Sequence, residues 1–159
     1  MNGKLNFVSA YNEILHISFL YPDNWRISKT KNFTIVLIDK QKMGFMANLG
    51  FSQSEFAKPT AEGLQLEIDY IKKYQQQTYP DFQQKSEEKL FIDNNPAYLQ
   101  IFNWHYEEEK SNLSNFFGMI LQKDNTLLEI NGSCLRELSD IYLPLFDKIV
   151  RSIRFIYMS

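Results

Sequence analysis

Cysteine is nearly absent from the sequence: Cys134 is the only one among 159 residues. A single cysteine cannot form an intramolecular disulfide, and no Cys-x-x-Cys or His-x-x-x-His pair is present to form a local zinc site. Glycine and proline are also scarce, with 6 and 5 residues, which excludes a collagen-like or long low-complexity segment. The closest glycines, Gly44 and Gly50, are too far apart for a Walker loop or a dinucleotide fingerprint, so phosphate-loop nucleotide binding is excluded.

The sequence also lacks an excess of one charge and any long hydrophobic run. Its net charge is −2 and its pI about 5.7, so we expect no nucleic-acid partner. The longest stretch without Asp, Glu, Lys or Arg is residues 94–106, which is shorter than the roughly 20 residues of a spanning helix. We therefore expect no transmembrane segment.

No signal peptide is visible at the start of the chain, because no basic segment precedes an apolar one. The sequence as written therefore predicts a cytoplasmic protein. A periplasmic or membrane-anchored location would require a leader that has been removed.

The length predicts a single domain over residues 1–159. Alternating or β-branched runs separated by turn residues predict strands at 14–21, 25–28, 33–38, 44–52, 85–92, 97–107, 116–122 and 126–134, with a polar loop at 108–115. Asn131-Gly132 is a common hairpin pair, but no strand of matching length follows it, so we interpret it as part of a strand.

Two helices interrupt these strands. The first is opened by Thr60 as N-cap and fades through residues 75–77 before Tyr79-Pro80, and Gly63 weakens its first turn. The second spans 140–152 with Ser139 as its cap, and a short strand at 154–157 follows. Hairpin-length connections imply an antiparallel sheet, so the sequence predicts an α+β fold in which helices flank that sheet on both faces.

Three segments, at Phe19–Trp25, 91–97 and 142–155, together resemble the PsbP-like superfamily, which includes the DcrB-like and Mog-type proteins. Phe19–Trp25 resembles its N-terminal F-x-Y-P-x-x-W signature, residues 91–97 are similar to its central hairpin, and residues 142–155 are similar to its last helix and closing strand. Ile153 departs from the phenylalanine that is usual there. The resemblance implies an α/β/α sandwich with a binding role and no common catalytic set, so it assigns a function to no residue of this chain.

The predicted strand at 97–107 carries the most conspicuous aromatic face. Trp104 and Tyr106 follow Tyr98 and Phe102 on alternate positions, next to an acidic run that starts at Glu107. Two interpretations stay open: packing beneath a helix, or a groove for a partner with the acidic loop as its rim. On the second interpretation, the candidate partner-binding residues are Trp104, Tyr106, His105 and Glu107. Trp25, in contrast, is predicted to fill the core.

Catalytic alternatives rest on few residues. His105 and Glu107 share a strand face and could hold a divalent ion with another carboxylate, and Cys134 could pair with His105 as nucleophile and base. A solvated strand end and a buried cysteine explain the same residues. We expect no catalytic residue, cofactor or metal site.

The sequence therefore predicts a non-catalytic binding or assembly-factor domain that contacts another protein, with a homodimer as one option. The alternatives are an adaptor or chaperone for a secreted effector and, ranked last, a small metal-dependent hydrolase.

Overall fold

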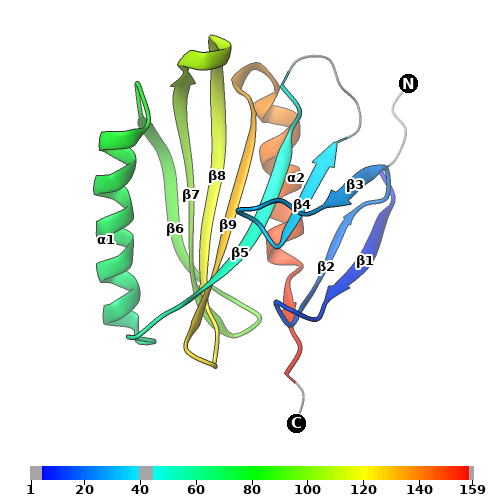
Figure 1. Cartoon of the computed structure of the whole chain (residues 1–159), viewed down its shortest axis with the longest axis vertical. Coiled ribbons are helices and arrows are strands. Elements are labelled where there is room, and N and C mark those ends of the chain that lie inside the picture. Colours follow the sequence, from blue (N-terminus) through cyan, green and yellow to red (C-terminus); the bar gives the residue numbers. More distant parts are fainter. Residues whose placement is uncertain (1–4, 40–44, 158–159) are drawn as a thin grey trace.

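The computed structural model of the chain describes residues 5–39 and 45–157. Within these residues, the strands form two antiparallel sheets, and two α-helices pack against the larger sheet (Figure 1). The predicted α+β class, with an antiparallel sheet flanked by helices, is confirmed.

The larger sheet has seven strands, and every neighbouring pair in it is antiparallel. The two strand groups that the first helix separates in the sequence meet where Phe51 lies opposite Ile130. Both halves of the chain thus form one continuous sheet. Its strands, in spatial order, are β3 (Trp25–Ser28), β4 (Ile35–Asp39), β5 (Asn48–Glu55), β9 (Thr126–Leu135), β8 (Ser111–Leu121), β7 (Asn95–Tyr106) and β6 (Gln83–Ile92).

A smaller sheet joins the two ends of the described chain. Its central strand β2 (Ile17–Pro22) pairs with β1 (Phe7–Asn12) on one side and with β10 (Arg154–Phe155) on the other. The short closing strand is thus confirmed. The sequence does not predict β1, because this strand has no fully buried residue and no clear apolar alternation.

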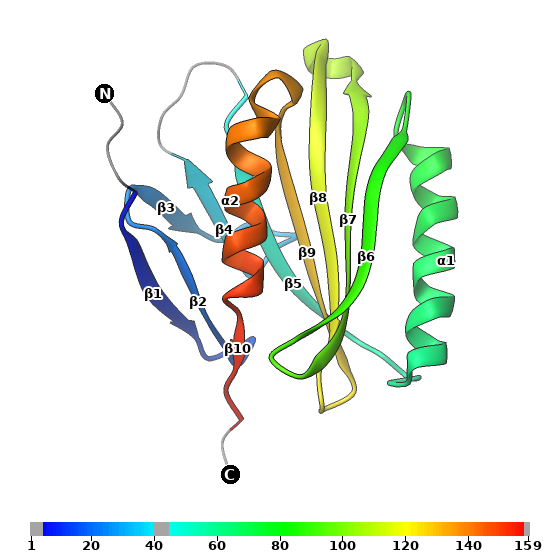
Figure 2. The same ribbon diagram turned by 180° about the vertical axis from the view of Figure 1, so that it is seen from behind.

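The helices α1 (Ala61–Thr78) and α2 (Ser139–Arg151) cover opposite faces of the larger sheet (Figure 2). The adjacent residues Phe116 and Phe117 of β8 show this arrangement, because neighbouring side chains on a strand point to opposite faces. Phe116 belongs to the core beneath α2, which also contains Phe146 and Trp25, whereas Phe117 belongs to the core beneath α1. The predicted core position of Trp25 is confirmed. Neither helix combines the length and apolarity needed to span a bilayer.

The start and end of α1 follow the sequence signals closely. The Thr60 side chain accepts a hydrogen bond from the Gly63 N–H at 3.0 Å, so the predicted N-cap is confirmed. The helix ends at Thr78, but it does not fade through its glutamines. Gln75 is buried and exchanges two side-chain hydrogen bonds with Gln100 of β7, at 2.7 and 2.9 Å. This reciprocal amide pair satisfies both buried side chains and stabilises the last turns of α1.

The predicted cap of α2 is wrong. Ser139 is the first residue of the helix, Leu138 occupies the cap position, and no side chain caps the helix start. A 3₁₀ turn, η2 (Arg136–Leu138), leads directly into α2 and takes the place of a side-chain cap. The side of α2 that faces the sheet carries Phe146, Ile149 and Val150, and all three are fully buried.

The polar loop predicted at 108–115 is also wrong. Strand β8 begins at Ser111, so the connection from β7 is only the 3₁₀ turn η1 (Glu107–Glu109) and Lys110, whose φ of 49° closes the turn. The polar residues at the start of β8 are compatible with a strand because neighbouring strands satisfy them; Ser114, for example, donates to Asn103 of β7 at 2.6 Å.

Asn131-Gly132 lies inside β9, which confirms that it is no hairpin turn. A Cβ on Gly132 would lie 2.8 Å from Leu49 and 3.0 Å from Phe146, so glycine is required here for close packing of α2 on the sheet. The first residue of the strand predicted at 44–52 lies outside the described residues, and β5 occupies Asn48–Glu55.

Candidate functional site

The strand end predicted to bind a partner lies where β7 extends past the end of α1 (Figure 1). Side chains alternate along the strand, so Trp104 and Tyr106 point to the face that carries α1, whereas His105 points to the opposite face. Glu107 follows directly in η1, and its carboxylate is exposed. The structure thus brings Trp104 and Tyr106 together and directs His105 away from them.

Three aromatic rings form the apolar part of this site. The rings of Trp104 and Tyr106 stack with their centroids 5.3 Å apart and an interplanar angle of 27°. Tyr79, the residue that caps α1, meets Trp104 edge-on at 4.9 Å. Burial, followed by the nearby Tyr74 hydroxyl, raises the pKa of Tyr79. Sequence reasoning missed Tyr79 as a member of the site, because it lies 25 residues before Trp104 in the chain.

A polar network holds the Trp104 indole in place. Its Nε1–H donates to the Asn115 side chain at 2.8 Å, and the same Asn115 oxygen accepts from Ser133 at 3.1 Å. The Asn115 amide in turn donates to Asn131 at 3.2 Å, and the Arg136 guanidinium donates to the Trp104 carbonyl at 3.1 Å. The bond from Asn115 holds the indole in place while Trp104 stays partly exposed, and the sequence predicted none of the four residues of this network.

The rim of the site is acidic. Glu107, Glu108 and Glu109 are consecutive and exposed in η1. The Tyr106 hydroxyl donates to Glu108 at 3.2 Å, and the negative charge of Glu108, together with this bond, raises the pKa of Tyr106. We define the aromatic–acidic patch as the partly exposed rings of Tyr79, Trp104 and Tyr106 together with the exposed acidic turn of Glu107, Glu108 and Glu109.

The catalytic alternative depends on Cys134, His105 and Glu107. Cys134 is fully buried in the core beneath α2 with Leu128 and Ile130, and burial raises the pKa of its thiol to about 12. The His105 ring instead contacts Asn112, with Nδ1 at 2.8 Å, and its Nε2 lies 3.9 Å from a Glu107 carboxylate oxygen. Among the described residues, no group of three His, Cys, Asp or Glu side chains is placed to hold a metal ion. Because Cys134 is buried, its thiol is protonated and shielded from solvent at neutral pH.

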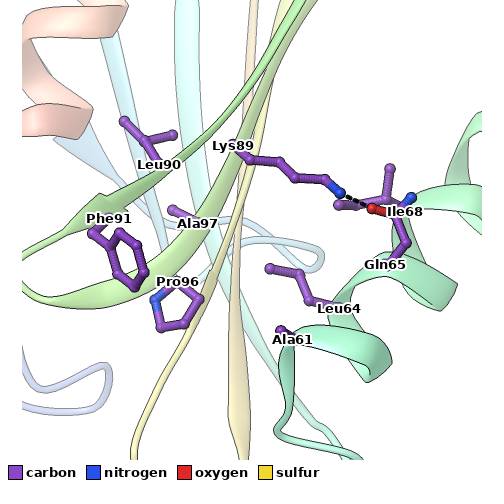
Figure 3. A pocket seen from close by; sticks show the side chains of 9 residues that line it. All are labelled: Ala61, Leu64, Gln65, Ile68, Lys89, Leu90, Phe91, Pro96 and Ala97. Carbon is purple, nitrogen blue, oxygen red and sulfur yellow. Dashed lines mark hydrogen bonds between the residues drawn. The ribbon is translucent and has the colours of Figure 1, made fainter.

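A separate apolar pocket lies at the other end of α1, against the β6–β7 hairpin (Figure 3). It has a volume of about 240 Å³, and its apolar lining includes Leu64, Phe91 and Pro96. Lys89 closes one side by donating to the Gln65 side chain. Phe91 is 72% exposed, which is unusual for a phenylalanine. The pocket is slightly smaller than the roughly 300 Å³ of the smallest typical ligand sites, so it could accept one apolar side chain.

No protein-family model and no curated protein matches the sequence. Solved structures, however, resemble it over nearly its whole length. LpqN of Mycobacterium tuberculosis, described as involved in cell envelope biogenesis, superposes with a TM-score of 0.73 at 11% identity, covering 98% of this chain and 93% of LpqN. Cyanobacterial PsbP from Synechocystis sp. PCC 6803 superposes with a TM-score of 0.67 at 16% identity, covering 96% and 94%.

The Ran-binding protein Mog1p of Saccharomyces cerevisiae superposes with a TM-score of 0.62 at 10% identity, covering 96% of this chain and 97% of Mog1p. The chain has the PsbP–Mog1 fold. The fold that the sequence resemblance implied is thus confirmed. Identities this low establish the PsbP–Mog1 fold alone, so the role of the aromatic–acidic patch has to be argued from its own geometry.

Proposed function

We propose that the chain is a non-catalytic protein-binding domain whose partner docks on the aromatic–acidic patch. The observation that carries this proposal is the stacked pair Trp104 and Tyr106, which is partly exposed and hydrogen-bonded through the Tyr106 hydroxyl to the exposed Glu108 carboxylate of the acidic turn η1. Aromatic residues held in fixed orientations are typical anchors of protein interfaces, and here Asn115 already fixes the indole. The yeast neighbour with the same fold is described as Ran-binding, which supports a binding role for this fold.

The charge of the patch selects the chemistry of the partner. A Lys or Arg side chain can lie over the Trp104 or Tyr106 ring and reach the carboxylates of η1. A basic, partly apolar segment of a protein therefore fits the patch best. His105 contributes indirectly in this proposal, through its approach to Glu107 from the opposite face of β7.

The two tryptophans provide an internal test of this proposal. We expect the indole N–H resonance of Trp104 to shift on titration with a peptide of alternating lysine and leucine, because its ring is part of the patch. The resonance of Trp25 should stay in place, since that ring is buried beneath α2. Two-dimensional ¹H–¹⁵N spectra of the full chain measure both resonances in one sample.

A matched pair of variants separates specific binding from general charge attraction. Changing Glu107, Glu108 and Glu109 to glutamine should weaken binding of the basic peptide by roughly tenfold or more. The control changes Glu13, Asp23 and Glu55, which are exposed elsewhere, to their amides and alters the net charge equally. Equal losses in the two variants, or a Trp25 shift as large as that of Trp104, would contradict the proposal.

A further inference from the structure

Helix α1 carries apolar side chains on two sides. Leu64 and Ile68 are buried against the sheet, as expected for a surface helix. On the outward side, Leu66, Tyr70 and Tyr74 follow one another at i, i+4 and i+8, and they are 58%, 65% and 50% exposed. An outward stripe of large side chains is the pattern of a helix that packs against a second partner.

Charged residues border this stripe in a fixed order. One side of the helix carries, at positions i, i+4, i+7 and i+11, the residues Glu62, Leu66, Asp69 and Lys73. The order is acidic in the first half and basic in the second. In the part of the chain that the structure describes, none of the three charged side chains forms an ion pair, whereas the neighbouring Lys72 pairs with Glu87 at 3.0 Å.

We infer that the outward stripe of α1 binds the same stripe of a second copy of this chain, with the two helices antiparallel about a two-fold axis near Tyr70. This arrangement places Leu66 opposite Tyr74 of the second copy and lets the two Tyr70 rings meet at the axis. Lys73 then lies between the levels of Glu62 and Asp69 of the second copy, so opposite charges meet on both sides of the axis.

The self-complementary charge order is the reason for choosing a second copy over a different protein. A two-fold interface requires that a surface match itself when reversed, and an acidic-to-basic order along the helix meets this requirement. Antiparallel helices also bring the positive end of each helix dipole to the negative end of the other. The inference does not depend on the proposed function, because Tyr70 and Tyr106 can be changed separately.

Sedimentation of the full chain across a concentration series tests the inference. The wild type should shift from a mass of 18.9 kDa to twice that value with rising concentration. The variant Tyr70→Glu should weaken the dimer by roughly thirtyfold or more, since it places two like charges at the axis. Tyr11→Glu is the matched control, because Tyr11 is a 52% exposed tyrosine on β1 and should leave the dimer unchanged. Circular dichroism of both variants should give the wild-type spectrum, which checks that they are folded.

A charge exchange distinguishes this geometry from other modes of association. Lys73→Glu alone and Asp69→Lys alone should each weaken the dimer, and the double variant should recover most of the wild-type affinity. Three results would overturn the inference: a monomer at every concentration, equal dissociation in Tyr11→Glu, or a double variant as weak as the singles. Binding of a different protein to the stripe of a monomeric chain would overturn it as well.

Discussion

Replacing Phe146 with alanine is expected to lower the free energy of unfolding by about 3–5 kcal/mol. The ring is fully buried on α2, between Trp25 at 6.1 Å and Phe116 at 6.4 Å between ring centroids. It also fills the space left free by Gly132 of β9. Because strands on several sides contact this ring, the cavity cannot collapse easily, and the loss should lie well above that of an average substitution.

Phe91→Ala is the control for this prediction, because it removes the same side chain from a largely exposed position. We expect a change of about 0.5 kcal/mol or less for that variant. Urea unfolding of both variants, followed by circular dichroism, measures the difference. Similar losses in the two would mean that α2 does not pack on the sheet as described.

Gly63→Ala is expected to destabilise the chain by about 1–3 kcal/mol, although alanine is normally favoured over glycine inside a helix by roughly 1 kcal/mol. The reason is steric. A Cβ on Gly63 would clash with the backbone carbonyl oxygen of Lys58, and a backbone atom cannot move aside as a flexible side chain can. The first turn of α1 would have to shift, and with it the hydrogen bond from the Gly63 N–H to Thr60.

Glu62→Ala, one residue earlier and exposed, should change the free energy of unfolding by about 0.5 kcal/mol or less. Thermal unfolding of both variants is sufficient to compare them. An increase in stability for Gly63→Ala would show that the segment before α1 does not approach the helix as the structure has it.

Local signals predicted much of the fold correctly. The Thr60 cap, the end of α1 before Pro80, and the interpretation of Asn131-Gly132 as strand depend on residues close together in the chain. The start of β8 could not be predicted from such local signals. Its polar Asn115 is compatible with a strand only because Trp104 and Ser133 of the neighbouring strands donate hydrogen bonds to its side chain. Hydrogen bonds of this kind form only between strands that are distant in the sequence, so no local sequence pattern predicts them.

The candidate site, like the fold, could be predicted only in part from local sequence signals. Strand alternation predicted that Trp104 and Tyr106 share a face, and the acidic rim is visible in the sequence. Tyr79 and Arg136 reach Trp104 from segments on either side of it, 25 and 32 residues away, and no spacing rule connects them. Sequence reasoning thus identified the central side chains of the patch but not the residues that hold them in place.

The most direct test of the aromatic–acidic patch is photocrosslinking in the living host, with a photoreactive phenylalanine analogue placed at Tyr106 or, as control, at the exposed Ile14 of the β1–β2 turn. We predict one discrete protein adduct from position 106, none at that mass from position 14, and loss of the adduct when the three glutamates of η1 are changed to glutamine. The same adducts from both positions, no adduct at all, or an adduct from position 106 that persists in the glutamine variant would contradict the account.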